Sequence, residues 1–429
     1  MGPINPADHF TLVMHREIRA AGLAGNLCAI ALELDGVPPR ATVAARCRRF
    51  NERFPQATAR LRQHGRRFHW EPRAGGEIPF HPIAWNADEP GARDAILAEV
   101  LNRQHPEHDI PPIELFLLEG DGRSVLVLRW FHPAFDAKGA ELVLYHLFGD
   151  APPADATAEP VLENLIARWS LWDKIKLGFK AKRMVEGLDR HVSTLPSAVA
   201  RDTAGFRFSL LTLDRDDSAK VLANARRDVG LMGTTLYFIG CMMRALTTLG
   251  CAVEGDAFCV PYAMNLRRRR AVLPVFGNQV SFLFAQAPTD LLADRAALFR
   301  HLLDQSKHAV RDGLDRAMLP LLQAGSWLPL EKLGRIVRYN AQGRERSSFW
   351  FSFTGEMEPP LSAVEGCTVT GIGQFTPVTA PPSLGLLVSQ TSGRLTLCFN
   401  FIPEHFDADW LDRLRAVLLT ELLDAGVPA

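Results

Sequence analysis

A pair of apolar runs in the first third of the chain constrains the fold most. Residues 113–118 and 124–131 are rich in Leu, Ile, Val and Phe, and Glu119-Gly120-Asp121-Gly122 joins them. Glycine and aspartate tolerate the backbone angles of a tight turn, so the two runs predict an antiparallel hairpin. Residues 138–148 then have helical spacing and end at Gly149, a residue that commonly closes helices.

Strands and helices alternate in the same way through the rest of the chain. Apolar runs predict further strands at residues 26–35, 66–70, 206–213, 257–262, 278–286, 347–353, 384–388 and 394–401. Helical spacing predicts helices at residues 42–54, 92–103, 161–191, 218–227, 234–249, 291–310 and 407–423. With 429 residues the chain is too long for one ordinary core. Mixed elements in both halves therefore predict two α/β lobes of related design.

A linker separates the two predicted lobes. Residues 151–160 read Ala-Pro-Pro-Ala-Asp-Ala-Thr-Ala-Glu-Pro, the composition of an interdomain connection. We therefore predict a first lobe at residues 1–150, a linker and helical connection at 151–205, and a second lobe at 206–429.

Composition narrows the class of protein. Hydrophobic residues make up 47% and charged residues 22%, which is typical of soluble globular proteins. Lys+Arg and Asp+Glu both number 48, so net charge gives no reason to expect a nucleic-acid partner. The first residues lack the apolar core of a signal peptide, and no run is long enough to span a bilayer. We therefore expect a cytoplasmic protein.

The cysteine and histidine patterns argue against a disulfide framework or a metal site. The seven cysteines are scattered, and neither CxxC nor HExxH occurs. We expect reduced, mostly buried cysteines that pack as small hydrophobic residues, and neither a metal nor a bound cofactor.

The segment Phe131-His132-Pro133-Ala134-Phe135-Asp136-Ala137-Lys138-Gly139 carries the chemistry that the sequence indicates. His132 follows an apolar strand, and Pro133 ends the strand there. Asp136 stands where a carboxylate caps a helix, and Gly139 lets another backbone approach closely. A neutral histidine is a base at pH 7 and suits the removal of a proton from an acyl acceptor. From position alone, a histidine that only ends a strand fits equally well.

The spacing His132-x-x-x-Asp136-x-x-Gly139 resembles the HxxxDG signature of the chloramphenicol-acetyltransferase-like superfamily. That superfamily includes condensation domains of peptide synthetases, alcohol acyltransferases, polyketide-associated acyltransferases and wax ester synthases. Further stretches are similar to its pattern in the same order. They are Ala59-Arg60-Leu61-Arg62, the run Val260-Pro261-Tyr262-Ala263-Met264-Asn265-Leu266-Arg267, the pair Gly277-Asn278, the run Ser352-Phe353-Thr354-Gly355, and the final strand pair and helix at residues 384–423.

The chain departs from the superfamily pattern at two positions. Phe131 stands where condensation domains and wax ester synthases usually carry a first histidine, which favours ester formation over peptide condensation. The glycine follows the aspartate after two residues rather than immediately, which leaves the spacing from His132 to Asp136 intact.

The resemblance implies two lobes in a V with a tunnel between them, and His132 as general base near its middle. It implies direct transfer from an acyl-CoA or acyl-carrier thioester, as co-substrate, to a small-molecule hydroxyl or amine. It also implies that Asp136 is structural and pairs with an arginine, for which Arg267 is our candidate. The alternative is that Arg267 belongs to a surface cluster with its three following arginines.

The remaining expectations concern the residues that stabilise the oxyanion, the other histidines and a surface for partners. Ser352, Thr354 and Asn278 are candidates to stabilise the tetrahedral oxyanion, although such residues also commonly cap turns. The other histidines, among them His105, His108, His301 and His308, are interpreted as surface residues. Residues 169–184 combine aromatic with basic residues, which fits a solvated helix between the lobes or contact with a membrane surface, carrier protein or coenzyme A phosphate.

Two alternative functions stay open at this level. One is a free-standing condensation-type enzyme whose donor rides on an acyl or peptidyl carrier protein. The other is a non-catalytic member that binds a carrier or another partner through its cleft, for which a blocked cleft around His132 would be the sign.

Overall fold

The computed structural model describes residues 4–86, 89–149, 161–188, 195, 205–231, 233–251, 255–267, 274–340, 343–358 and 360–424. The predicted linker at residues 151–160 lies outside these described residues, as does the end of the helix predicted to reach residue 191.

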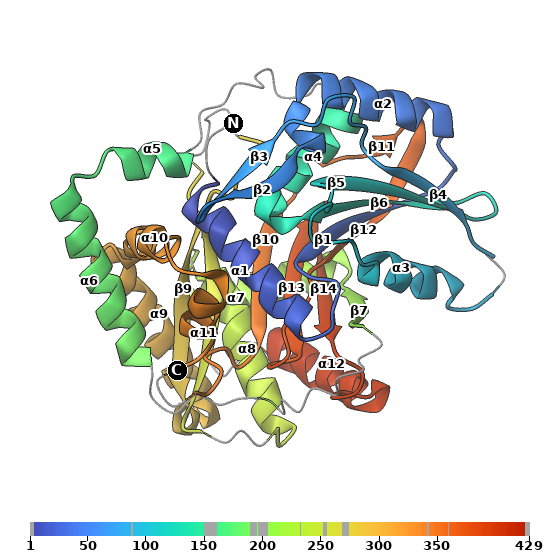
Figure 1. Cartoon of the computed structure of the whole chain (residues 1–429). Coiled ribbons are helices and arrows are strands. Elements are labelled where there is room, and N and C mark those ends of the chain that lie inside the picture. Colours follow the sequence, from blue (N-terminus) through green and yellow to red (C-terminus); the bar gives the residue numbers. More distant parts are fainter. Residues whose placement is uncertain are drawn as a thin grey trace.

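The predicted hairpin lies in the middle of a six-stranded sheet with the order β11-β12-β1-β6-β5-β4. Strands β5 (Ile113–Glu119) and β6 (Ser124–Phe131) pair antiparallel, and every residue of β6 is buried. Helices α2 (Arg40–Arg53) and α4 (Ala137–Phe148) cover one face of the sheet (Figure 1). Helix α3 (Ala92–Asn102) and part of the second sheet cover the other face. Both faces of the sheet are therefore buried, which explains why these strands are continuously apolar.

Two strands of this sheet come from the far end of the chain. Strand β12 (Cys367–Phe375) pairs antiparallel with β1 (Leu27–Leu34), and β11 (Ala363–Val364) extends the edge. In Figure 1 the orange β12 lies beside the blue β1. The predicted lobe at residues 206–429 thus contributes strands to the sheet of the other lobe. Sequence patterning missed β12 because its outer half, Cys-Thr-Val-Thr-Gly, is polar and half-exposed.

The second half of the chain builds a four-stranded sheet with the order β10-β13-β14-β7 and a separate long hairpin. Helix α8 lies almost wholly within the core between this sheet and the surrounding helices. The strands are β7 (Arg207–Thr212), β8 (Ala257–Asn265), β9 (Val280–Pro288), β10 (Trp350–Glu356), β13 (Leu384–Thr391) and β14 (Arg394–Phe401). The helices are α7 (Arg215–Val229), α8 (Thr234–Thr248), α9 (Arg295–Arg311) and α12 (Ala408–Leu423).

The single helix predicted at residues 161–191 is two helices. Helix α5 (Val161–Ala167) ends before Ser170, and α6 (Leu171–Leu188) begins after it. The Ser170 hydroxyl accepts the Asp173 N–H at 3.1 Å, while the Asp173 carboxylate accepts the Ser170 N–H at 3.2 Å. This reciprocal pair is a capping box, and it starts a new helix at Ser170.

Helix α1 (Pro6–Ala20) was not predicted, and it lies between the two halves of the fold (Figure 1). It contacts the turn η2 (His132–Ala134) on one side and helices α10 (Leu314–Gly325) and α11 (Leu330–Arg338) on the other. Asn5 and Asp8 form a capping box around Pro6, which occupies the first helical position. These residues are the sequence signal that marks the helix. The remaining elements are η1 (Pro55–Thr58), β2 (Arg60–His64), β3 (Arg67–Glu71), β4 (Phe80–Ala84) and η3 (Thr289–Ala293).

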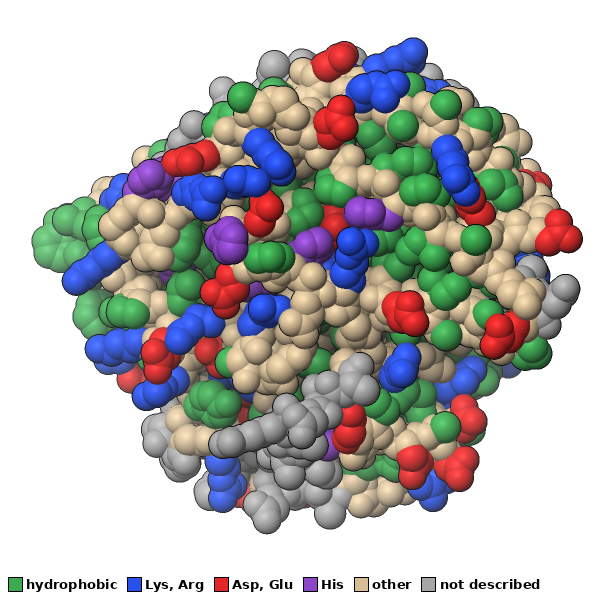
Figure 2. All heavy atoms as spheres, turned by 45° about the vertical axis from the view of Figure 1, so that its right-hand side comes forward, with side chains coloured by type: hydrophobic (Ala, Val, Ile, Leu, Met, Phe, Trp, Pro, Cys, Tyr) green, Lys and Arg blue, Asp and Glu red, His purple; other side chains and the backbone are tan. Residues whose placement is uncertain are grey.

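The cysteines are mostly buried, and the surface carries charges of both signs. All seven cysteines are free; five are buried, and Cys251 and Cys367 are half-buried. On the face shown in Figure 2, Lys and Arg are interspersed with Asp and Glu rather than gathered into one patch. No single helix in the described ranges is long and apolar enough to cross a membrane; α7 and α8 would qualify only as a pair bent by 97°.

Candidate active site

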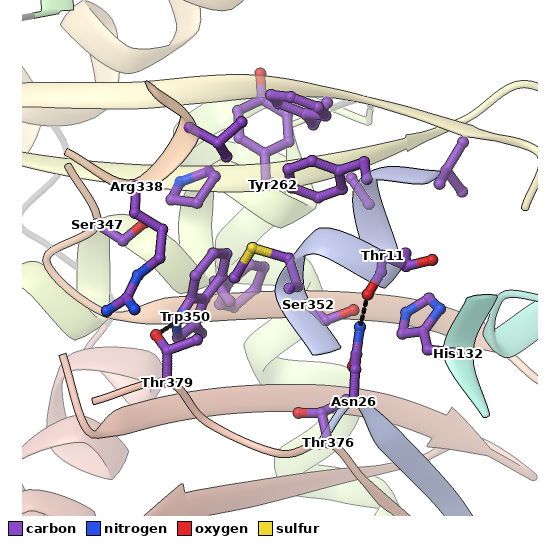
Figure 3. Close-up of a pocket in the computed structure, with 18 of the residues that line it drawn as sticks. Thr11, Asn26, His132, Tyr262, Arg338, Ser347, Trp350, Ser352, Thr376 and Thr379 are labelled. Carbon is purple, nitrogen blue, oxygen red and sulfur yellow. Dashed lines mark hydrogen bonds between the residues drawn. The ribbon is translucent and has the colours of Figure 1, made fainter. Parts of the chain in front are cut away.

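A cavity of about 220 Å³ lies between the two halves of the fold, and His132 is part of its wall (Figure 3). Most of its lining is apolar, while its polar groups lie toward the two ends. His132, Thr11 and Asn26 lie at one end, and Arg338 and Ser347 lie at the other (Figure 3). The apolar lining is Ala7, Phe10, Met14, Ile18, Cys28, Pro261, Tyr262, Ala263, Val280, Phe282, Phe284, Leu322, Val337, Trp350, Phe351, Pro377 and Leu386.

The backbone of His132 is held on both sides. Its N–H donates to the Asn26 carbonyl at 3.0 Å, which continues the pairing of β1 with β6 by one residue. Its carbonyl accepts the Phe135 N–H at 3.2 Å and the Asn278 side-chain amide at 2.9 Å. The imidazole therefore projects into the cavity from a fixed turn.

Burial sets the protonation state of His132. Removal from water disfavours the imidazolium and lowers the pKa of His132 below its ordinary value. The carbonyl groups of its own turn, the Asp136 charge and the Asn278 amide oppose this shift only in part. His132 is therefore neutral at pH 7 and can accept a proton.

Asp136 is not part of the cavity wall and is held by the second half of the chain. Its carboxylate caps α4 by accepting the Gly139 N–H at 3.0 Å. The same carboxylate accepts the Gln279 N–H at 2.8 Å and pairs with the Arg267 guanidinium at 2.6 Å. Burial alone would raise the pKa of Asp136, but Arg267 and these N–H groups outweigh it and lower that pKa. The ionised Asp136 thus links the two halves through a buried ion pair and a hydrogen bond.

Gly139 is required by a close approach of the backbone. A Cβ at Gly139 would lie 2.5 Å from the Val275 carbonyl oxygen, which is far inside van der Waals contact. Close by, the Gly277 N–H donates to the Ala134 carbonyl at 2.7 Å. Residues 275–279 therefore press against the turn that carries His132 and fix it from the other lobe.

The three candidate oxyanion donors lie in different places. Ser352 lines the cavity on β10, on the same side as His132 (Figure 3). Thr354 is not part of the cavity wall, and its buried hydroxyl has no hydrogen-bond partner among the residues that the structure describes. Asn278 is fully buried, and its amide nitrogen already donates to Asp8 at 2.8 Å and to the His132 carbonyl. Only Ser352 is therefore placed to reach a substrate.

Sequence reasoning missed the contribution of α1 to this site. Ala7, Phe10, Thr11, Met14 and Ile18 form one wall of the cavity. Beside this face, Asp8 accepts the backbone N–H of Asn278 at 2.7 Å as well as its side-chain amide. The capping box at residues 5–8 would have located the helix, but its cross-chain contacts have no local sequence signal.

The end of the cavity that Arg338 and Ser347 line was also missed. Arg338 on α11 donates to Glu345 at 3.0 Å, to Glu17 at 3.1 Å and to the Pro381 carbonyl at 2.9 Å. Burial raises the pKa of Glu345 to about 7, although Arg338 opposes the shift. The three donating nitrogens of Arg338 are thus engaged within the protein, and this end is a braced ionic cluster.

Several of the other histidines are not surface residues, because His9 and His15 are buried and His105 is half-buried. His105 is 14% exposed and its Nε2 lies 2.9 Å from the Glu114 carboxylate, which also faces the buried Arg129. The prediction was wrong for His105 because its imidazole contacts the buried Glu114 on β5. His108 and His308 are exposed, and His301 is half-buried with Nε2 3.0 Å from the Gln286 carbonyl oxygen.

Comparison with known proteins rests on structure. No family model matches the sequence, and the search of curated proteins found no match. Among solved structures, the chain is similar to trichothecene 15-O-acetyltransferase from Fusarium sporotrichioides, with a TM-score of 0.71 at 13% identity over 98% of this chain and 94% of that chain. It is also similar to the first condensation domain of the CDA synthetase, with a TM-score of 0.70 at 15% identity over 99% and 96%.

A third neighbour was solved with an acyl-CoA. The starter condensation domain of rhizomide synthetase, in a mutant form complexed with C8-CoA and Leu-SNAC, has a TM-score of 0.67 at 13% identity over 99% and 94%. At this identity the likeness shows the fold. The chain therefore has the fold that these acetyltransferase and condensation-domain structures share, as the sequence resemblance predicted.

Proposed function

We propose that the chain is an acyltransferase that moves an acyl group from a thioester directly to a hydroxyl acceptor, with His132 as general base. The observation that carries this proposal is a neutral, backbone-clamped imidazole in the wall of an apolar cavity between two lobes. An amine is the less favoured acceptor, since Phe131 occupies the place of the first histidine of condensation domains.

The proton balance of the reaction needs one base and no acyl-enzyme intermediate. The acceptor hydroxyl attacks the thioester carbonyl while His132 takes the hydroxyl proton. The tetrahedral oxyanion then collapses, the carbon–sulfur bond breaks, and the thiolate leaves with the proton that His132 returns. The products are an ester and a free thiol, and His132 ends neutral, as it began.

Ser352 is the residue best placed to stabilise the oxyanion. Its hydroxyl lies on the His132 side of the cavity, whereas the donors of Asn278 are occupied and Thr354 lies outside the wall. A hydroxyl aimed at developing negative charge in a site that excludes water contributes far more than it would in water.

Acyl-CoA is the donor we favour, and a carrier-bound thioester is the alternative. The similarity to a starter condensation domain solved with C8-CoA supports a thioester of either kind. The non-catalytic hypothesis finds no support in the cavity, because an open volume of about 220 Å³ adjoins His132.

The test is thiol release from acyl-CoAs of several lengths, with and without alcohol acceptors. We expect acceptor-dependent release by the wild type and a loss of about 10²- to 10⁴-fold in His132→Ala. His301→Ala is the matched control, since His301 lies on α9 away from the cavity, and it should keep full activity. Unchanged transfer by His132→Ala would exclude this histidine as the base. Turnover only with a loaded carrier protein would replace acyl-CoA as the donor.

A further inference from the structure

Helix α6 has two apolar faces, and only one of them packs against the protein. Its inner face, with Ala181 fully buried and Leu177 and Met184 beside it, packs on α10. Four other large side chains are exposed on α6: Leu171 at 72%, Trp172 at 72%, Ile175 at 38% and Phe179 at 62%. These outer side chains are not needed to hold the helix in place.

The four exposed side chains share one face of the helix. At 100° per residue, positions 171, 172, 175 and 179 fall within an arc of about 100°. Figure 1 shows α6 at the periphery of the molecule, with α10 on its inner side. Over residues 171–179 the face is therefore a convex ridge of leucine, tryptophan, isoleucine and phenylalanine, and the ion pair of Lys182 with Glu186 continues the same face toward the end of the helix.

Positive charge flanks this ridge. Residues 171–188 contain five basic and two acidic residues, a net charge of +3 in a chain whose net charge is zero. Lys176 and Arg183 are exposed next to the apolar arc, while Lys182 pairs with Glu186 at 3.5 Å. Lysine and arginine beside exposed tryptophan and phenylalanine are typical of helices that lie in the headgroup region of anionic membranes.

The size and shape of the ridge favour a lipid surface over a protein groove. Its four side chains expose on the order of 500 Å², whereas a stable protein interface buries about 800 Å² on each partner. A bilayer accepts a narrow convex helix face without a complementary shape, and anionic headgroups match the flanking charge.

We propose that the exposed face of α6 docks the protein on the surface of anionic membranes. Trp172 and Phe179 enter the boundary between headgroups and acyl chains, and Lys176 and Arg183 meet the headgroup phosphates. Docking is peripheral, because only one side of α6 enters the lipid while the other stays packed on α10. It does not depend on the chemistry at His132.

The placement of α6 connects this surface with the cavity. Helix α10, on which α6 packs, contributes Leu322 to the cavity wall, and β9 behind it contributes Val280, Phe282 and Phe284. A membrane bound at α6 would thus lie one helix layer from the apolar lining.

The test is sedimentation with two kinds of vesicle. One is phosphatidylcholine alone, and the other contains about 30% phosphatidylserine, an anionic lipid that makes the surface potential negative. We expect the full chain to bind the anionic vesicles and to be released by salt. Trp172→Ser/Phe179→Ser should bind at least about tenfold more weakly. Lys176→Glu/Arg183→Glu should lose the preference for phosphatidylserine.

Leu231→Ser/Ile336→Ser is the matched control, because both side chains are exposed apolar residues outside α6, at 73% and 50%. It should bind vesicles as the wild type does. All variants change exposed side chains, so their thermal midpoints should match the wild type. Brominated lipid should quench the tryptophan emission of the wild type, and this quenching should be lost in Trp172→Phe.

Two results would overturn the proposal. One is equal vesicle binding by the wild type and Trp172→Ser/Phe179→Ser, or no binding by either. The other is retention on an immobilised acidic acyl carrier protein without vesicle binding, which would assign the ridge to a protein partner.

Discussion

At the residue scale, the site depends on a charge pair that never touches the cavity. Asp136 and Arg267 are 8% and 3% exposed, and they join the start of α4 to the end of β8. Gln279 and Gly139 donate to the same carboxylate. The pair therefore holds both the turn of His132 and the segment that presses on it.

Removal of either partner leaves a buried charge without compensation. We expect Asp136→Asn and Arg267→Leu each to lower the free energy of unfolding by about 3 kcal/mol. The double variant should cost less than the sum of the two, because both charges are gone. Urea unfolding of the four proteins measures the coupling. Strict additivity would mean that the pair does not act as a unit.

At the scale of the element, α1 is the part of the site that reaches furthest across the fold. Asp8 forms the capping box of α1 with Asn5 and also accepts both N–H groups that Asn278 presents to it. Asn278 in turn donates to the His132 carbonyl. One carboxylate thus links the start of a helix to the orientation of the proposed base.

Asp8→Ala should therefore affect both stability and catalysis. We expect a loss of about 2 kcal/mol, since one half of the capping box is lost and buried N–H groups are left without an acceptor. We expect kcat for acyl transfer to fall about tenfold as the His132 turn relaxes. Asp294→Ala is the control: Asp294 caps α9 by accepting the Ala297 N–H at 3.0 Å but is remote from the cavity. It should lose about 1 kcal/mol and keep kcat. An unchanged kcat in Asp8→Ala would contradict the positioning role.

The elements also show how far sequence reasoning reaches. The hairpin β5–β6 and the start of α4 were predicted because their patterns are local: apolar runs, a Gly-Asp-Gly turn and an aspartate cap. Strand β12 could not be, because its pairing with β1 is set by a partner more than 300 residues away in sequence. Arg267 was named as the partner of Asp136 only through the superfamily resemblance, and no local pattern identifies it.

At the scale of the whole molecule, the two halves are joined because segments of each half pack within the other. Strand β12 enters the sheet of the first half, residues 275–279 hold the His132 turn, and α1 packs between η2 and α11. The cavity is built at this junction, so its shape depends on contacts that no single lobe contains. The boundaries at residues 150 and 206 stay a prediction. The sheet of the first half nevertheless contains β11 and β12, which come from beyond residue 206.

Two buried histidines make this junction sensitive to acid. Burial lowers the pKa of His9 to about 4, and burial with the nearby charge of Arg19 lowers that of His15 to about 3. Both lie on α1, and the His15 Nδ1 accepts the Asn26 N–H at 3.0 Å. Below pH 6.5 the unfolded chain binds protons that the folded chain does not, so stability falls as the pH falls. Glu345, with its pKa raised to about 7, contributes in the opposite direction.

A variant at His15 isolates one of these protons. In His15→Asn the amide oxygen can replace Nδ1 as acceptor, although the ring contact with Phe131 is lost. The variant should be less stable at pH 7.5. From pH 6 to pH 5, however, the wild type should lose about 1 kcal/mol more than the variant, because only the wild type has this imidazole to protonate on unfolding. Urea unfolding at both pH values measures the difference, and His108→Asn, at an exposed loop position, should follow the wild type. Parallel pH profiles for the wild type and His15→Asn would show that α1 does not carry this acid sensitivity.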